Sequence, residues 1–166
     1  MGFVNNSIPH CRRLDLQKYI DNDVEGMVIE CQLGKNKWLI AALYKPPCVS
    51  DANFKKCFLS LSEELLTITT RVMILGDLNC DMNKSNKLND MCGIMGLKNI
   101  VVGNTCFKSI SNPTAIDVIL VSSKLAIAES LNTDIGISDC HNVVGCAMKA
   151  FRPNRMKKEI YYRSFR

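Results

Sequence analysis

Short apolar runs, each stopped by a turn residue, constrain the fold of this 166-residue chain most strongly. Residues 37–44 form one such run and end before Pro46-Pro47, and residues 71–75 form another and end at Gly76. Runs of this length bounded by turn residues are typical of buried strands rather than of helices. The sequence therefore predicts strands inside a sheet at both places, the first of them central.

Two other segments carry the periodicity of helices. We expect Asp51 to cap the first helix, whose buried face is formed by Phe54, Phe58, Leu61, Leu65 and Ile68. A second, shorter helix closes near Gly96 and has an apolar side of Leu88, Met91, Cys92 and Met95. Further strands are predicted at residues 27–33, 115–122 and 144–151, the last with Val144, Cys146, Met148 and Ala150 on one face. Because strands outnumber helices, a layered α/β sandwich fits best.

Length and composition indicate a soluble protein of about one domain. No apolar run reaches the roughly 18 residues that a membrane-spanning helix needs. The first residues lack the basic start and apolar stretch of a secretory signal. We therefore expect an intracellular protein, nuclear or cytoplasmic and not secreted, without a membrane partner.

Nine cysteines, with no Cys-x-x-Cys spacing, are the most unusual feature of the composition. Without a secretory signal they are expected to be reduced thiols, several of them small buried hydrophobes. A zinc site of Cys140, His141 and Cys146 is conceivable, but the usual paired ligand spacing is absent. The buried, structural interpretation is therefore favoured.

Charge is concentrated at the end of the chain. Residues 149–166 carry seven Lys or Arg against Glu159, so residues 1–148 sum to −1 of the total +5. Such a tail could contact nucleic-acid phosphates. We favour the interpretation that it is a solvated linker, because a short basic run is weak evidence alone.

Three places put polar groups directly against apolar strands, which is costly unless the position has a function. In the first, Asp77 and Asn79 follow a buried strand and share one side of it by period-2 geometry. In the second, Asp117 lies within an otherwise apolar strand and needs a partner such as a histidine. In the third, Ser138, Asp139 and His141 cluster just before the last strand.

The order of these motifs resembles a known superfamily. Gly76-Asp77-Leu78-Asn79, then Ile116-Asp117, then Ser138-Asp139 resemble the signature of the endonuclease/exonuclease/phosphatase superfamily. Residues 43–47 (Leu-Tyr-Lys-Pro-Pro) and 161–165 (Tyr-Tyr-Arg-Ser-Phe) resemble the endonuclease domain of non-LTR retrotransposons of the jockey or CR1 kind. The resemblance implies a DNase I-like four-layer α/β/β/α fold, here missing its first strands. It implies a partial domain at 1–151 and a basic linker at 152–166, with a reverse transcriptase downstream in the parent element.

The resemblance also implies a chemistry, the cleavage of DNA phosphodiesters with a divalent metal, usually Mg²⁺. Asp77 would orient or deprotonate the attacking water, and Asn79 would hold the water or the phosphate. Tyr44 would lie against the scissile phosphate, and Asp139 would help to hold the metal. Asp117 would aim the catalytic histidine, for which His141 is the candidate. Thr105 and Ser138 would be supporting polar groups.

Two departures from the family pattern lead us to expect little or no activity. The chain begins after the family's metal-binding Glu, so Mg²⁺ would bind weakly, and residues 2–9 resemble an internal family strand entered midway. The family has His directly after Ser-Asp, where this chain has Cys140. In a strand-like segment, a slip of one residue points His141 at the opposite face unless a bulge re-aims it.

Two other functions remain open. The alternative is a non-catalytic nucleic-acid-binding or interaction module on the same fold, which the basic tail would support. A phosphatase of lipids or small phosphoesters ranks third, because residues 45–47 and the closing linker resemble retrotransposon proteins.

Overall fold

The computed structural model describes residues 2–20, 24–84, 86–122 and 127–148. Within these ranges the chain forms a six-stranded sheet, in the order β1-β2-β3-β4-β6-β5, and a two-stranded sheet of β7 and β8. The strands are β1 (His10–Arg12), β2 (Glu25–Leu33), β3 (Asn36–Tyr44), β4 (Val72–Asp77), β5 (Leu97–Asn99), β6 (Asp117–Ser122), β7 (Ile127–Thr133) and β8 (Val143–Met148). The helices are the 3-10 helix η1 (Leu14–Tyr19), α1 (Asp51–Ile68) and α2 (Lys87–Ile94).

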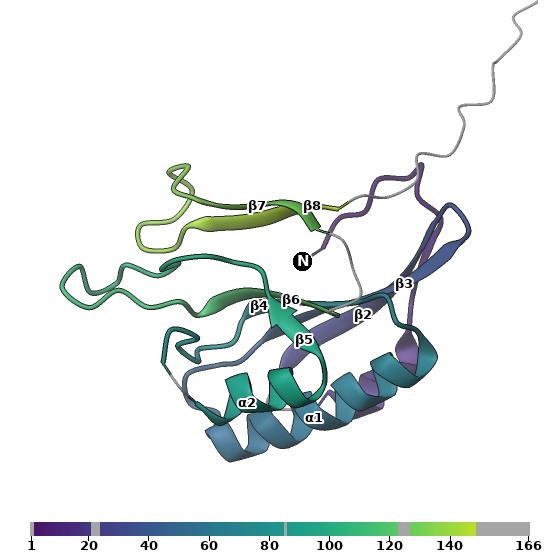
Figure 1. Cartoon of the computed structure of the whole chain (residues 1–166), viewed down its shortest axis with the longest axis horizontal. Helices are drawn as coiled ribbons and strands as arrows, with labels where there is room; N and C mark the ends of the chain where they lie inside the picture. The colour runs from purple at the N-terminus through teal and green to yellow at the C-terminus, as the bar shows by residue number, and fades with distance from the viewer. Residues whose placement is uncertain (1, 21–23, 85, 123–126, 149–166) are drawn as a thin grey trace, which may run out of the picture.

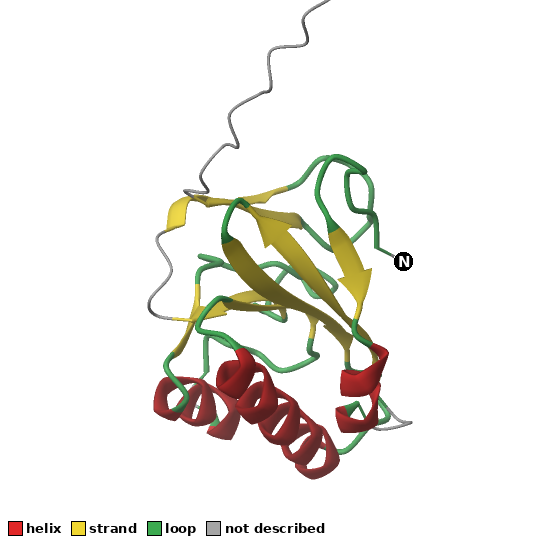
Figure 2. Ribbon diagram, turned by 90° about the vertical axis from the view of Figure 1, so that its right-hand side faces the viewer, coloured by secondary structure: helices red, strands yellow, loops and turns green. Residues whose placement is uncertain are grey.

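The elements stack in layers. Figure 1 shows α1 and α2 on one face of the six-stranded sheet and the β7–β8 pair over the other face. In Figure 2, turned by 90°, all three helices lie on the same side of the molecule. The sheet is mixed, because β3 and β4 are parallel and its other neighbours are antiparallel. The predicted two-sheet α/β sandwich is thus confirmed, and the described helices cover one of its outer faces.

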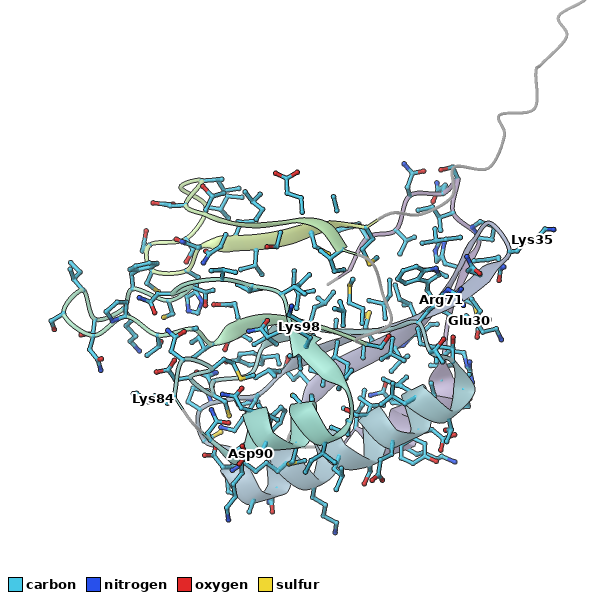
Figure 3. The ribbon with its side chains drawn as sticks, viewed as in Figure 1. Glu30, Lys35, Arg71, Lys84, Asp90 and Lys98 are labelled. Atoms are coloured by element: carbon cyan, nitrogen blue, oxygen red, sulfur yellow. The ribbon has the colours of Figure 1, made fainter. Side chains whose placement is uncertain are left out.

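Each central strand buries both of its faces, which explains its continuous apolar sequence. In β4, Val72 and Ile74 pack against the helices, whereas Met73 belongs to a second core between the two sheets. In β6, Val118 and Leu120 likewise face the helices. Side chains fill the space between the two sheets in Figure 3. From β8, Val144, Cys146 and Met148 pack into this second core, as the alternation predicted; Ala150 and Phe151 lie outside the described residues.

Helix α1 shows how the sequence fixes a boundary. Its predicted buried face is confirmed, since Phe54, Phe58, Leu61 and Leu65 are fully buried, and Ile68 is partly buried against the same core. The prediction that Asp51 caps the helix was wrong by one residue. The Oγ atom of Ser50 accepts a hydrogen bond from the Asn53 N–H at 3.2 Å, and Asp51 is the first helical residue.

Several short elements were not predicted. Strands β1 and β5 are three residues long, and β7 was not expected at all. Residues 2–9 do not form the family strand that the resemblance suggested, because the structure describes them as loop up to β1. The basic linker at 152–166 lies outside the described residues. None of the described helices is long and apolar enough to cross a membrane.

Candidate active site

Two carboxylates meet where β4 and β6 adjoin. These strands are antiparallel, and their register places Asp77 directly opposite Asp117. The sequence predicted that β4 ends at Gly76, but it continues through Gly76 to Asp77. Because directly opposed residues of an antiparallel pair have neighbouring side chains, the sheet itself brings the two acids together.

Gly76 allows β3 and β4 to approach closely beside this pair. Its φ of +139° lies in a region that other residues rarely adopt. A Cβ atom here would lie 1.8 Å from the carbonyl oxygen of Leu43 in β3. The parallel pairing then extends past the end of β3, where the Lys45 N–H donates to the Asp77 carbonyl at 3.0 Å. The glycine thus fixes the strand end from which Asp77 projects.

A chain of hydrogen bonds links Thr105, Asp117 and His141. The hydroxyl of Thr105 accepts the N–H groups of Ile116 and Asp117, at 3.1 and 3.0 Å. Its own proton is therefore donated to Asp117 Oδ2, 2.7 Å away. The same oxygen lies 3.0 Å from His141 Nδ1. Because Asp117 Oδ2 acts as an acceptor toward the Thr105 hydroxyl, His141 Nδ1 is its second donor and carries a proton. The other ring nitrogen of His141, Nε2, is not used in this contact.

His141 reaches the site, although the one-residue slip alone predicted that its side chain would point at the opposite face. The N–H groups of Thr105 and Cys106 both donate to the Thr114 carbonyl at 2.9 Å, the two-to-one pattern of a β-bulge. On its other side this segment pairs antiparallel with His141, opposite Cys106. The bulge therefore lies in the segment that pairs with His141 rather than at the histidine itself. The chain supplies the histidine one residue later than the family pattern and still brings it to Asp117.

Asn79 joins the site through its backbone and its amide. Its φ is +46°, and its N–H donates to Asp77 Oδ1 at 2.9 Å. Its Nδ2 donates to the Lys45 carbonyl at 2.7 Å. Asn79 therefore holds the loop after β4 and orients the Asp77 carboxylate.

Lys45 belongs to the motif at residues 43–47, but the sequence predicted no role for it. It is 3% exposed, and its Nζ lies 3.2 Å from Asp51 Oδ1. A lysine this deeply buried is rare unless it is paired. The signal that could have revealed it is its position, immediately after a central strand and before two prolines.

The environment of Asp77 disfavours its charged form. Burial raises the pKa of the Asp77 carboxyl above its ordinary value, and the nearby Asp117 raises it further. The Asn79 N–H, His141 and Lys45 oppose this shift without cancelling it. A carboxyl with a raised pKa in a polar cluster is a candidate general base.

The remaining candidates lie around this cluster. Tyr44 is exposed at the end of β3 and, with Gly76, lines a cavity of about 1070 Å³ whose walls include residues of η1 and α1. Ser138 Oγ accepts the N–H groups of Cys140 and His141, at 3.3 and 3.1 Å, and so shapes the turn before β8. Asp139 is exposed in that turn.

Metal ligands are available in the same place. Ligand atoms of Asp77, Asp117 and His141 all lie within 4.8 Å of one another, and Asp139 is not part of this group. Among the described residues, one oxygen of each carboxylate accepts no hydrogen bond from the protein. One or two carboxylates with water and substrate phosphates form the usual Mg²⁺ site, so the residues present fit that ion.

Solved structures of endonuclease/exonuclease/phosphatase proteins have a similar fold. The endonuclease domain of TRAS1, a telomere-specific non-LTR retrotransposon, superposes with a TM-score of 0.67 over 84% of this chain, at 14% identity. An endonuclease/exonuclease/phosphatase family protein from Leptotrichia buccalis gives 0.56 over 75%, at 16% identity. The catalytic domain of human Nocturnin gives 0.53 over 77%, at 15% identity.

This chain spans 66%, 53% and 52% of those three structures, less than two thirds of each. No protein-family model matches the chain, and no curated protein sequence matches it. The superpositions on solved structures show that the chain has the fold of endonuclease/exonuclease/phosphatase proteins.

Proposed function

We propose that this chain is a phosphodiester hydrolase module that nicks DNA, of the non-LTR retrotransposon endonuclease type. The observation that carries the proposal is the convergence of Asp77, Asp117 and His141 on this fold. DNA cleavage of the retrotransposon kind is supported by the superposition on the TRAS1 endonuclease domain, with a TM-score of 0.67, and by the motif at residues 43–47. The reverse transcriptase downstream stays a prediction of the resemblance.

Each residue of the cluster has a part in the proposed reaction. Asp77, with a raised pKa and one free oxygen, removes the proton of the attacking water. The Nδ1 of His141 is held by Asp117, which leaves Nε2 to donate a hydrogen bond to the phosphate when it is protonated. Thr105 anchors Asp117 and thereby fixes the orientation of the imidazole. Tyr44 contributes an exposed ring and hydroxyl beside the phosphate.

A divalent cation completes the proposed site. Asp117 would hold it through the oxygen that accepts no protein hydrogen bond, while Asp77 keeps its free oxygen for the attacking water. Asp139 would reach the cation only if its turn moves. When bound, Mg²⁺ would neutralise the charge that develops on the phosphate oxygens. Because the described chain offers it few carboxylates, we expect weak metal binding and a low rate.

Nicking of supercoiled plasmid with Mg²⁺ tests the proposal. We expect the full chain to convert supercoiled to open-circular DNA, and Asp77→Asn to lower the rate by about 10²–10⁴-fold. The matched control is Asp90→Asn, an exposed acid on α2, on the helical side of the molecule in Figure 3. Equal rates for Asp77→Asn and Asp90→Asn would refute the assignment. Salt-sensitive DNA binding without nicking would favour the non-catalytic module instead.

A further inference from the structure

The structure brings together a second set of potential metal ligands that the proposed reaction does not use. The Sγ atoms of Cys106 and Cys140 and an imidazole nitrogen of His141 all lie within 4.8 Å of one another. Cys106 is 6% exposed and Cys140 is partly exposed. Two thiols and an imidazole are the ligand types that Zn²⁺ prefers, whereas Mg²⁺ prefers oxygen.

Backbone pairing makes this cluster a fixed feature rather than a chance approach. The Phe107 N–H donates to the Cys140 carbonyl at 2.7 Å, and the Asn142 N–H donates to the Thr105 carbonyl at 2.8 Å. These two bonds flank Cys106 and His141, which therefore face each other as a non-hydrogen-bonded antiparallel pair. Side chains of such pairs approach most closely. The turn held by Ser138 then places Cys140 beside them.

The surroundings of His141 also suit a metal ligand. Its Nδ1 is held by Asp117, so the nitrogen available for a metal is Nε2. A carboxylate on the other ring nitrogen of a ligating histidine fixes the ring and makes it a stronger ligand. At tetrahedral angles, two zinc–sulfur bonds of about 2.3 Å hold their sulfurs roughly 3.8 Å apart. The two sulfurs, which lie within 4.8 Å of each other, exceed that separation by at most about 1 Å.

We propose that Cys106, Cys140 and His141 form a binding site for a soft divalent cation such as Zn²⁺, with Asp117 supporting the histidine. Binding replaces two thiol S–H bonds by two metal–sulfur bonds and releases two protons to the buffer. Three protein ligands leave the fourth position to water. Cys146, which the sequence suggested as a ligand, is packed between the two sheets instead.

The site shares His141 with the proposed active site, and this consequence rests on the proposed function. A cation on Nε2 withdraws that nitrogen from the phosphate, so Zn²⁺ inhibits the hydrolysis that Mg²⁺ supports. The substitution of Cys140 for the family's histidine thus adds a ligand as well as displacing the imidazole. The cation site itself is tested without any activity measurement.

The test is titration of the full, metal-free chain with Co²⁺ under a non-thiol reductant. We expect one equivalent to give the thiolate-to-cobalt charge-transfer absorption and the intense visible bands of a tetrahedral site, both abolished by added Zn²⁺. Cys140→Ser and Cys106→Ala should each weaken Zn²⁺ binding by at least about 100-fold, since loss of supporting groups alone costs about 10–100-fold. Asp117→Asn should weaken Zn²⁺ binding by about 10–100-fold, because Asp117 supports the histidine and is not itself a ligand.

Controls separate this site from other thiols. Cys48 is exposed and distant in the sequence from the proposed ligands. Cys48→Ser should therefore leave Zn²⁺ affinity unchanged, and so should Cys146→Ala. If buried Cys106→Ala fails to fold by circular dichroism, the partly exposed Cys140→Ser carries the test. The proposal is overturned if Co²⁺ gives no charge-transfer band, if Cys140→Ser keeps it, or if the two thiols form only a disulfide and bind no cation when reduced. Failure to nick DNA with Co²⁺ binding intact would instead overturn the proposed function alone.

Discussion

Replacement of Gly76 by alanine is the sharpest test of how the strand ends are positioned. The added Cβ would lie 1.8 Å from the Leu43 carbonyl oxygen, whereas such contacts are essentially never shorter than 3.0 Å. Strands β3 and β4 would have to separate by about 1.2 Å at this point, and the φ of +139° would remain strained. The hydrogen bond from the Lys45 N–H to the Asp77 carbonyl lies directly beside the clash.

The cost follows from these two effects. Backbone strain of about 1–3 kcal/mol and one or two weakened hydrogen bonds of about 0.5–1.5 kcal/mol each sum to roughly 2–6 kcal/mol. For a chain of this size, about 2–4 °C per kcal/mol predicts a fall in Tm of roughly 4–24 °C. Thermal unfolding followed by circular dichroism measures it.

Gly93 supplies the matched control for this measurement. It lies within α2, and a Cβ there would meet no atom within 4 Å. Gly93→Ala should therefore raise stability by about 0.5–1 kcal/mol, through the higher helix propensity of alanine. A Tm for Gly76→Ala within about 2 °C of the wild-type value would refute the close approach of β3 and β4.

Three further predictions concern the site and its supports. Asp77→Asn should raise Tm at pH 7. Because folding raises the pKa of the Asp77 carboxyl, this group stabilises the fold at acid pH, and that contribution is lost as pH rises through the folded pKa. The gain in Tm from the neutral asparagine should therefore vanish below about pH 4. A pH-independent gain in Tm would contradict this. Thr105→Val should cost about 1–3 kcal/mol in urea unfolding, because it leaves buried groups unpaired, whereas Thr105→Ser should restore most of the loss. Ser50→Ala should cost about 0.5–2 kcal/mol and Ser50→Asp much less, since only the first removes the α1 cap; equal losses would exclude the cap.

The layers of the fold were predictable because burial on both faces of a strand leaves a clear pattern. The apolar runs of β3, β4 and β6 and the periodicity of α1 all correspond to elements of the structure. Strands β1 and β5 could not be found this way, since three residues are too few for a period. Their positions depend on pairing with β2 and β6, whose residues lie farther along the chain.

The site was predictable in composition but not in geometry. Asp77 and Asp117 could be singled out because each interrupts an apolar strand. The resemblance implied the contact of His141 with Asp117, but the backbone path that makes it could not be predicted, because the segment paired with His141, at Thr105 and Cys106, lies far from the histidine in the sequence. Cys106 was missed as a neighbour of His141 for the same reason. A one-residue slip is therefore a poor basis for excluding a side chain from a site when its pairing partner is unknown.

The most direct test of the proposed mechanism compares the two histidines of the chain. His141 touches Asp117, whereas His10 is exposed in β1, where its Nδ1 contacts only the Ile8 carbonyl among the described residues. Mg²⁺-dependent plasmid nicking would be measured in zinc-free buffer for the wild type, His141→Gln and His10→Gln. The mechanism predicts that His141→Gln lowers the rate by about 10²–10⁴-fold and that His10→Gln leaves it unchanged. Absence of nicking by folded wild-type protein, or equal rates for the two variants, would contradict it.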